Sequence, residues 1–178
     1  YEDKMIIFKT TETSENYDQI VFCRHDIKEI TIPSFIKIIG SYAFENCEQL
    51  QRIDIPSNSE LQIIEKDAFS FSSIESIFIP ASVIDLKDGW CKKTNNLTAF
   101  KIDPKNSRYV TYKDKMIFCK TTETSKTYDQ VVFCRRDVIK TTIPPFIKII
   151  GPHAFEGCSK LQRIDISPNS ELQIIGND

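Results

Sequence analysis

The chain repeats itself over long stretches, and this repetition limits its fold more than any other feature of the sequence. Residues 1–67 align with residues 112–178 without a gap, at a constant offset of 111 residues, and 46 of the 67 aligned positions are identical. Similarity at a fixed spacing is typical of arrays and solenoids, in which each unit is stabilised by its neighbours. The sequence therefore predicts an array that arose by recent tandem duplication.

A shorter motif recurs inside each long copy. The first, fourth and sixth residues of the motif are mostly aliphatic, and the second, third and fifth are variable. A proline usually follows the sixth residue, as in the segment from Leu50 to Pro56. The motif begins at Ile27, Leu50, Ile74, Leu97, Val138 and Leu161. The starts are 23 or 24 residues apart, except for 41 residues between the fourth and the fifth, so one long copy contains four short turns.

Each motif is predicted to be a short β-strand with its apolar side chains pointing inward. A second apolar pair follows, as at Ile36 and Ile39, and then an alanine and a phenylalanine, as at Ala43 and Phe44, where a brief helical turn is expected. About six inward residues contribute roughly 1.5–3 kcal/mol each on burial. Ordering about 23 residues costs on the order of 1–2 kcal/mol for each residue. One turn is therefore unstable alone, which predicts a stack of turns.

The predicted organisation is a single solenoid over residues 1–178. Residues 27–102 and 138–178 hold the repeats, and the last repeat is expected to be truncated and open. Residues 103–137 contain β-prone segments around a polar stretch and are predicted to be a hairpin insertion, with residues 1–26 as the same hairpin in the first copy. Such an open end is expected to fray or to associate end to end with another molecule.

One string within the repeats resembles the BspA-type leucine-rich repeat. The matching positions are Ile36, Ile39, Gly40, Ala43, Phe44, Cys47, Leu50, Ile53, Ile55 and Pro56. The insertion is also similar to the hairpin found in such arrays. The resemblance implies a leucine-rich-repeat solenoid of mostly short β-strands with brief helical turns and two hairpin insertions. It also implies a microbial surface or secreted protein with a role in adhesion. The third turn departs from the pattern, because Trp90 stands near the usual phenylalanine position.

Composition and motifs exclude several classes of function. The 23 Lys and Arg residues are interspersed with 25 Asp and Glu residues, which gives no basic footprint for nucleic acid. Only 5 glycines are present and no phosphate-binding glycine motif occurs, so no cofactor is expected. No apolar run approaches the length of a membrane-spanning helix, which predicts no direct membrane insertion by this segment.

The six cysteines are predicted to be buried reduced thiols. Cys119 and Cys134 correspond to Phe8 and Cys23 in the first copy, so one of the two positions accepts either cysteine or phenylalanine and is an apolar slot. A disulfide between Cys119 and Cys134 is the alternative, and metal or catalytic use is the least favoured. His25 aligns with Arg136 in the second copy, so it is not expected to be an obligatory base for Cys23. The chain is therefore predicted not to be an enzyme.

The outward positions of the predicted strands are the candidate binding surface. In horseshoe solenoids this sheet lines the usual ligand face, and Phe78 is predicted to be an exposed aromatic among charged groups, as in a protein-binding hot spot. The candidates are Gln51, Arg52, Asp54, Glu75, Phe78, Lys101, Gln162, Arg163 and Asp165. The leading hypothesis is a non-catalytic module that binds a protein or glycoconjugate. The alternatives are a plain solvated face and a structural spacer that holds another domain away from a surface.

Overall fold

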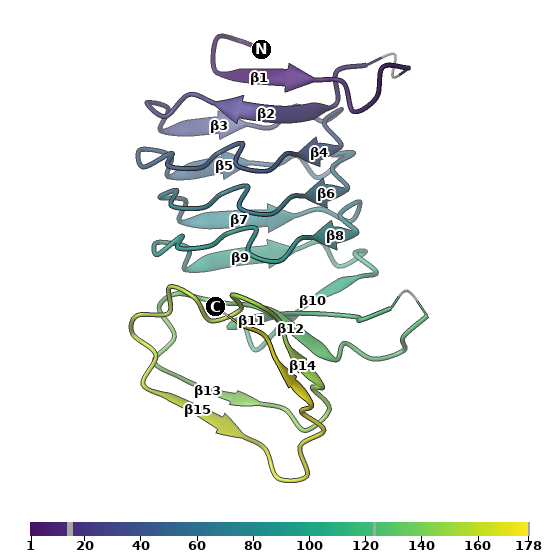
Figure 1. Cartoon of the computed structure of the whole chain (residues 1–178), viewed down its shortest axis with the longest axis vertical. Helices are drawn as coiled ribbons and strands as arrows, with labels where there is room; N and C mark the ends of the chain where they lie inside the picture. Colours follow the sequence, from purple (N-terminus) through teal and green to yellow (C-terminus); the bar gives the residue numbers. More distant parts are fainter. Residues whose placement is uncertain (14–15, 123, 178) are drawn as a thin grey trace.

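The computed structural model describes residues 1–13, 16–122 and 124–177 of the chain (Figure 1). The predicted hairpin segments include residues 14, 15 and 123 and the predicted last turn includes residue 178, and these four positions lie outside the described residues. The fold is a leucine-rich-repeat solenoid in which successive turns stack on one another by parallel β-pairing. The repeated motif positions are the reason, because they supply inward apolar side chains at every turn.

The motif segments form one sheet in the first half, which we call the first repeat sheet. Its strands pair in parallel in the order β3, β5, β7 and β9, with bounds Glu29–Thr31, Arg52–Asp54, Ser76–Ile79 and Ala99–Ile102. The register places equivalent residues beside one another, as for Ile30 beside Ile53. Both of these side chains are buried, as expected for the inward positions of the motif.

The second apolar pair of each turn forms a sheet of its own, which we call the first return sheet. Its order is β1, β2, β4, β6 and β8, with bounds Met5–Phe8, Gln19–Cys23, Ile38–Ile39, Ile63–Ile64 and Asp85–Leu86. β1 and β2 are antiparallel arms, whereas β2 continues the stack by pairing in parallel with β4. Gly40 follows β4 at a close approach, because a Cβ atom there would lie 2.8 Å from the carbonyl oxygen of Ile20.

The second half repeats this plan in two separate sheets. The second repeat sheet pairs β13 with β15, with bounds Lys140–Ile143 and Arg163–Ile166. The second return sheet has the order β10, β11, β12, β14 and β16, with bounds Tyr109–Tyr112, Met116–Cys119, Gln130–Cys134, Ile149–Ile150 and Ile174–Ile175. Neither sheet is hydrogen-bonded to its counterpart in the first half, so the strand ladders are interrupted between β9 and β13 (Figure 1).

The expected brief helical turn at Ala43 and Phe44 is wrong, because this segment forms a hydrogen-bonded turn. The amide of Ala43 donates to the carbonyl of Gly40 at 3.2 Å, but the amide of Phe44 donates to Ala68 of the next turn at 2.8 Å. Tyr42, at a φ of 62°, also has a left-handed conformation that a helix does not accommodate. Backbone groups that would bond within a helix are thus used to join successive turns.

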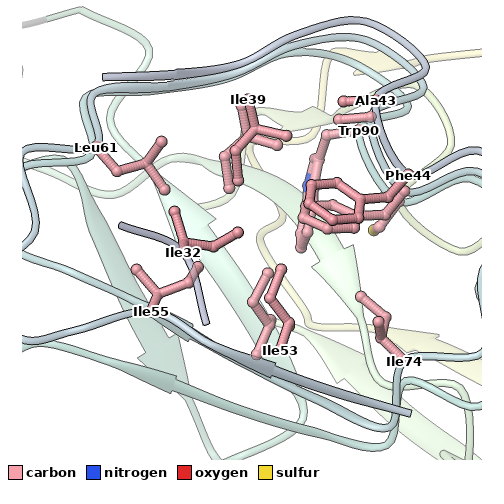
Figure 2. Close-up of a cluster of buried hydrophobic side chains, with 14 of the residues drawn as sticks. Ile32, Ile39, Ala43, Phe44, Ile53, Ile55, Leu61, Ile74 and Trp90 are labelled. Carbon is pink, nitrogen blue, oxygen red and sulfur yellow. The ribbon is translucent and has the colours of Figure 1, made fainter. Parts of the chain in front are cut away.

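Aromatic side chains run along the interior from turn to turn. Phe44 stacks on Phe69 with ring centroids 5.0 Å apart, and Phe69 meets Trp90 edge to face at 6.2 Å. Trp90 is 2% exposed, so it fills the interior position that phenylalanine holds in the other turns. Figure 2 shows Ile39 and Ile53 entering the interior from opposite sides, with Phe44 and Trp90 on a further side. This cluster is the core of the first half.

The second hairpin joins the two halves through buried side chains. Trp90 of the first half lies 5.9 Å from Phe133 of β12, measured between ring centroids, and Phe133 also contacts Phe100 edge to face. Phe133 is 1% exposed, whereas its counterpart Phe22 in the first copy is 41% exposed. The same residue type is therefore buried where a turn precedes it and exposed at the face formed by β1 and β2.

The base of this hairpin is fixed by one asparagine. Asn106 is buried, and its Nδ2 donates to the carbonyls of Pro80 and Val83 at 2.8 and 3.0 Å. Its Oδ1 accepts hydrogen bonds from the amides of Arg108 and Tyr109 at 2.9 and 2.8 Å. One side chain thus satisfies four backbone groups, two of them in the third turn, at the point where the chain leaves the fourth turn of the array for the hairpin.

Candidate ligand-binding face

The outward positions of the first repeat sheet form rows across its strands. Glu29 lies beside Arg52, Arg52 beside Ser76, and Ser76 beside Ala99. A second row contains Thr31 beside Asp54 and Phe78 beside Lys101. Residues two apart in a strand share one face, so both rows are on the same side of the sheet. The backbone register, and not any one strand, therefore creates this face.

Six of the predicted site residues lie on this face or directly beside it. Arg52, Asp54, Phe78 and Lys101 lie within the strands, and Gln51 and Glu75 lie just before β5 and β7. The last two are in adjacent turns, since the amide of Glu75 donates to the carbonyl of Gln51 at 3.1 Å. The face thus combines an amide, two acids, two bases and one aromatic ring within one sheet.

A shallow hollow of about 280 Å³ lies on this face around Phe78. Its lining includes Asp54, Phe78 and Lys101, together with the edges of the inward residues Ile53 and Ile77. Phe78 was predicted to be an exposed aromatic, and the structure shows it only partly exposed, because the side chain packs against the core. The ring is therefore held in place and presents only part of its surface between an acid and a base.

An arginine and an aspartate pair on the outward face of each copy. Nε of Arg52 donates to Oδ1 of Asp54 at 3.1 Å, and this hydrogen bond raises the pKa of Arg52. The equivalent distance from Arg163 to Asp165 is 2.6 Å. Both arginine side chains are 65% exposed, so a ligand can reach the charges that each pair presents.

The remaining predicted residues lie on the second repeat sheet. Gln162 precedes β15, and Arg163 and Asp165 lie within it, where they pair in register with Lys140 and Thr142 of β13. Because the two repeat sheets are separate, the structure does not bring these three residues into the hydrogen-bonded face that contains Phe78. The predicted set therefore divides into a group of six and a group of three.

A second hollow lies where the hairpin meets the first return sheet, and no pattern in the sequence predicted it. Its volume is about 540 Å³, and it is lined by Ile84, Asp85, Ser107, Arg108, Lys120, Thr121 and Thr122. Nε and Nη1 of Arg108 are buried without a hydrogen-bond partner. The contributing residues are up to 38 positions apart, and a one-dimensional pattern does not show that they converge.

Two further properties of the described part of the chain concern metals and membranes. Within residues 1–13, 16–122 and 124–177, no three His, Cys, Asp or Glu side chains are grouped so that they could hold a metal ion. Over the same residues, no helix has the length and apolar character needed to cross a membrane. All six cysteines are free and buried. Cys119 pairs in register with Gln130, whereas Cys134 pairs with Met116, so the two thiols are at different ends of the hairpin.

Comparison with known families gives one match that covers nearly the whole chain. The model of the BspA-type leucine-rich repeat region matches six copies of the repeat, within residues 15–128 and 126–178. No curated protein has a sequence that matches this chain.

Several solved structures share the fold at low sequence identity. The crystal structure of the pneumococcal vaccine antigen PcpA is 22% identical with a TM-score of 0.76, over 85% of this chain and 36% of that protein. A leucine-rich cell surface protein from Faecalibacterium prausnitzii is 19% identical with a TM-score of 0.70, over 85% of this chain and 42% of that protein. A leucine-rich-repeat protein from Eubacterium ventriosum is 20% identical with a TM-score of 0.56, over 86% and 51%. The chain therefore spans about half or less of each of these proteins.

Proposed function

This chain belongs to the BspA-type leucine-rich-repeat family, and from that premise we propose that it is a non-catalytic recognition module whose first repeat sheet binds a protein or glycoconjugate. The family match concerns a repeat region and names no enzyme. The observation that carries the proposal is the hollow around Phe78, where an aromatic ring lies between Asp54 and Lys101 on an accessible sheet. Aromatic rings beside charged groups are common in protein-binding hot spots.

The proposed location is a microbial cell surface, with adhesion as the role. Support comes from the family and from the relative in Faecalibacterium prausnitzii, which is described as a cell surface protein. Support for a ligand face also comes from the pairs Arg52–Asp54 and Arg163–Asp165, which occupy equivalent outward positions in both copies. A face of mixed charge favours a ligand that itself carries both charges and apolar surface, and gives no preference for a polyanion.

A binding screen with matched variants tests this proposal. The purified chain is exposed to extracellular matrix proteins, host-cell surface proteins and a glycan array, and affinities are measured for each binder by surface plasmon resonance. Phe78→Ala and Arg52→Ala are expected to weaken binding by about tenfold or more, as truncation of central contact residues does. Gln62→Ala, on the return-sheet side, is expected to leave the affinity unchanged.

Two outcomes would count against the recognition role. One is the absence of any binder in the screen, which would favour the alternative of a spacer that extends another domain. The other is a binder whose affinity is the same for the native chain, for Phe78→Ala and for Arg52→Ala. Circular dichroism spectra of the variants establish that a loss of binding is not a loss of fold.

A further inference from the structure

A buried arginine lies at the junction of the two halves. Arg136 follows β12 and is 2% exposed, and its guanidinium stacks over the ring of Phe133 at 4.6 Å. Nη1 donates to the carbonyl of Cys134 at 3.3 Å, and Nη2 donates to the carbonyl of Cys91 at 3.2 Å. Nε has no hydrogen-bond partner. Within the described residues, no carboxylate forms an ion pair with this side chain.

Such a charge needs an anion nearby. Arginine stays protonated in proteins, and a cation removed from water without a counter-charge is strongly unfavourable. The atoms that remain around the guanidinium are sulfur atoms. Nη1 lies 3.7 Å from Sγ of Cys158, and Nη2 lies 3.7 Å from Sγ of Cys91. A thiolate at one of these positions would compensate the charge.

The groups around the two sulfur atoms favour a thiolate at Cys158 and a neutral thiol at Cys91. The hydrogen bond from the thiol of Cys134 and the charge of Arg136 lower the pKa of Cys158 to about 7, against the opposing effect of burial. Burial dominates at Cys91 and raises its pKa to about 11. Each sulfur atom has two donors, Cys134 and Arg136 at Cys158 and Thr94 and Arg136 at Cys91, but the more deeply buried Cys91 remains a neutral thiol.

The other charged groups around Cys158 are already paired. Asp137 opposes the thiolate, but its carboxylate lies 2.6 Å from the guanidinium of Arg135. His153 and Glu156, on the turn that leads to Cys158, contact each other at 2.7 Å. The carbonyls of Cys134 and Arg135 each lie 3.6 Å from the sulfur and favour the thiol form. Arg136 is therefore the unpaired charge that faces this sulfur.

We propose that Cys158 is a thiolate held by Arg136 and is a modification site for hydroperoxides, with Cys134 as the resolving thiol. The sulfur of Cys158 attacks one peroxide oxygen, the O–O bond breaks, and the departing oxygen takes a proton from water, which leaves a sulfenic acid. The sulfur of Cys134 then attacks the sulfenic sulfur. A disulfide forms, the S–O bond breaks, and the hydroxyl leaves with the proton of Cys134 as water. Two electrons pass from the sulfur atoms to the peroxide.

The first copy contains the matched comparison. Cys23 and Cys47 correspond to Cys134 and Cys158 and are also joined by a thiol hydrogen bond, but in the first copy this bond lowers the pKa of Cys23 and raises that of Cys47. At the position of Arg136, the first copy has His25, whose side chain is exposed. The two thiol pairs therefore differ in the buried guanidinium and in which of the two thiols has the lowered pKa.

The charge pair also predicts a direction for pH dependence. The pKa of Cys158 in the folded chain lies below that of an ordinary thiol. The stabilisation from the pair is therefore fully present above the ordinary thiol pKa and is lost as the pH falls through about 7. Oxidation to the disulfide removes the thiolate and leaves Arg136 without its anion, so modification of Cys158 weakens the junction.

Ultraviolet titration and peroxide oxidation test the proposal. Thiolate absorbance at 240 nm, measured from pH 5 to 10 on the native chain, is expected to show one ionisation near pH 7. Cys158→Ser removes this ionisation, and Arg136→Met moves its midpoint up by more than about one pH unit. With limiting hydrogen peroxide at pH 7, mass spectrometry of unreduced peptides is expected to show the Cys134–Cys158 disulfide forming about tenfold faster than the Cys23–Cys47 disulfide.

The titration of the native chain and of Cys158→Ser decides the result even if Arg136→Met does not fold. A native chain without an ionisation below pH 8.5 would overturn the proposal, as would an ionisation near pH 7 that persists in Cys158→Ser. Equal oxidation rates for the two thiol pairs would also overturn it, because the guanidinium would then have no effect on reactivity.

Discussion

Phe69→Ala is expected to lower the free energy of unfolding by about 3–5 kcal/mol, the usual cost of removing a fully buried aromatic side chain. Phe69 is completely buried and contacts a ring on each side, with Phe44 at 5.0 Å and Trp90 at 6.2 Å. The substitution removes the middle member of this aromatic series. The turns on either side then lose their contact through the interior, and stacking is what stabilises each turn.

Denaturant unfolding followed by circular dichroism measures this effect. Phe71→Ala is the matched control, because the two phenylalanines belong to the same turn but Phe71 is 45% exposed. The ammonium group of Lys93 lies 5.2 Å from the centre of the Phe71 ring. The control is expected to cost less than about 1 kcal/mol. Comparable losses for both variants would mean that the aromatic series does not support the core.

Asn106→Ala is expected to destabilise the chain by about 2–4 kcal/mol, because four backbone groups lose their hydrogen-bond partner in a buried site. These groups are the carbonyls of Pro80 and Val83 and the amides of Arg108 and Tyr109. The hydroxyl of Tyr109 in turn accepts the amide of Leu86 at 2.7 Å. A displaced Tyr109 would therefore also expose the edge of β8.

Hydrogen exchange locates the loss from Asn106→Ala. Faster exchange is expected first at Leu86 and Tyr109, while amides in β4 and β6 keep their protection. Asn106→Asp separates the two functions of the side chain, since a carboxylate still accepts from the amides but cannot donate to the carbonyls. Ser107→Ala, at the exposed neighbour, is the control and is expected to change stability by less than about 0.5 kcal/mol. Unchanged exchange in Asn106→Ala would contradict this role.

The sequence was sufficient to predict the fold because the spacing of the repeats determines which residues of successive turns lie beside one another. Leu50, Ile53 and Ile55 recur at the same motif positions in successive turns, and the structure buries all three. The return sheet was not predicted as a sheet, since two-residue strands such as Ile38–Ile39 are too short to show an alternating pattern. The helical turn at Ala43 was wrongly predicted because local propensity does not show that these backbone groups bond to the next turn.

The candidate site was predictable only in part. Alternation along a strand was enough to assign Arg52 and Asp54 to the outward face, and both lie there. The partial burial of Phe78 depends on the neighbouring strand, which a single segment does not reveal. The burial of Cys158 was predicted, but its contact with Arg136 was not predictable, because the contact joins residues 22 positions apart and Arg136 also contacts Cys91 of the other half.

The contact between Trp90 and Phe133 bears on how a solenoid of this type can gain further 111-residue units. One side of this joint lies near the end of the first four turns and the other lies on the hairpin that opens the next unit. Phe22 on the first hairpin is the counterpart of Phe133, so the first 111-residue unit contains the residues of both sides of the joint. Duplication of a whole unit at the gene level can therefore lengthen the molecule in equal increments, because the residues that pack at the junction between units are duplicated with it.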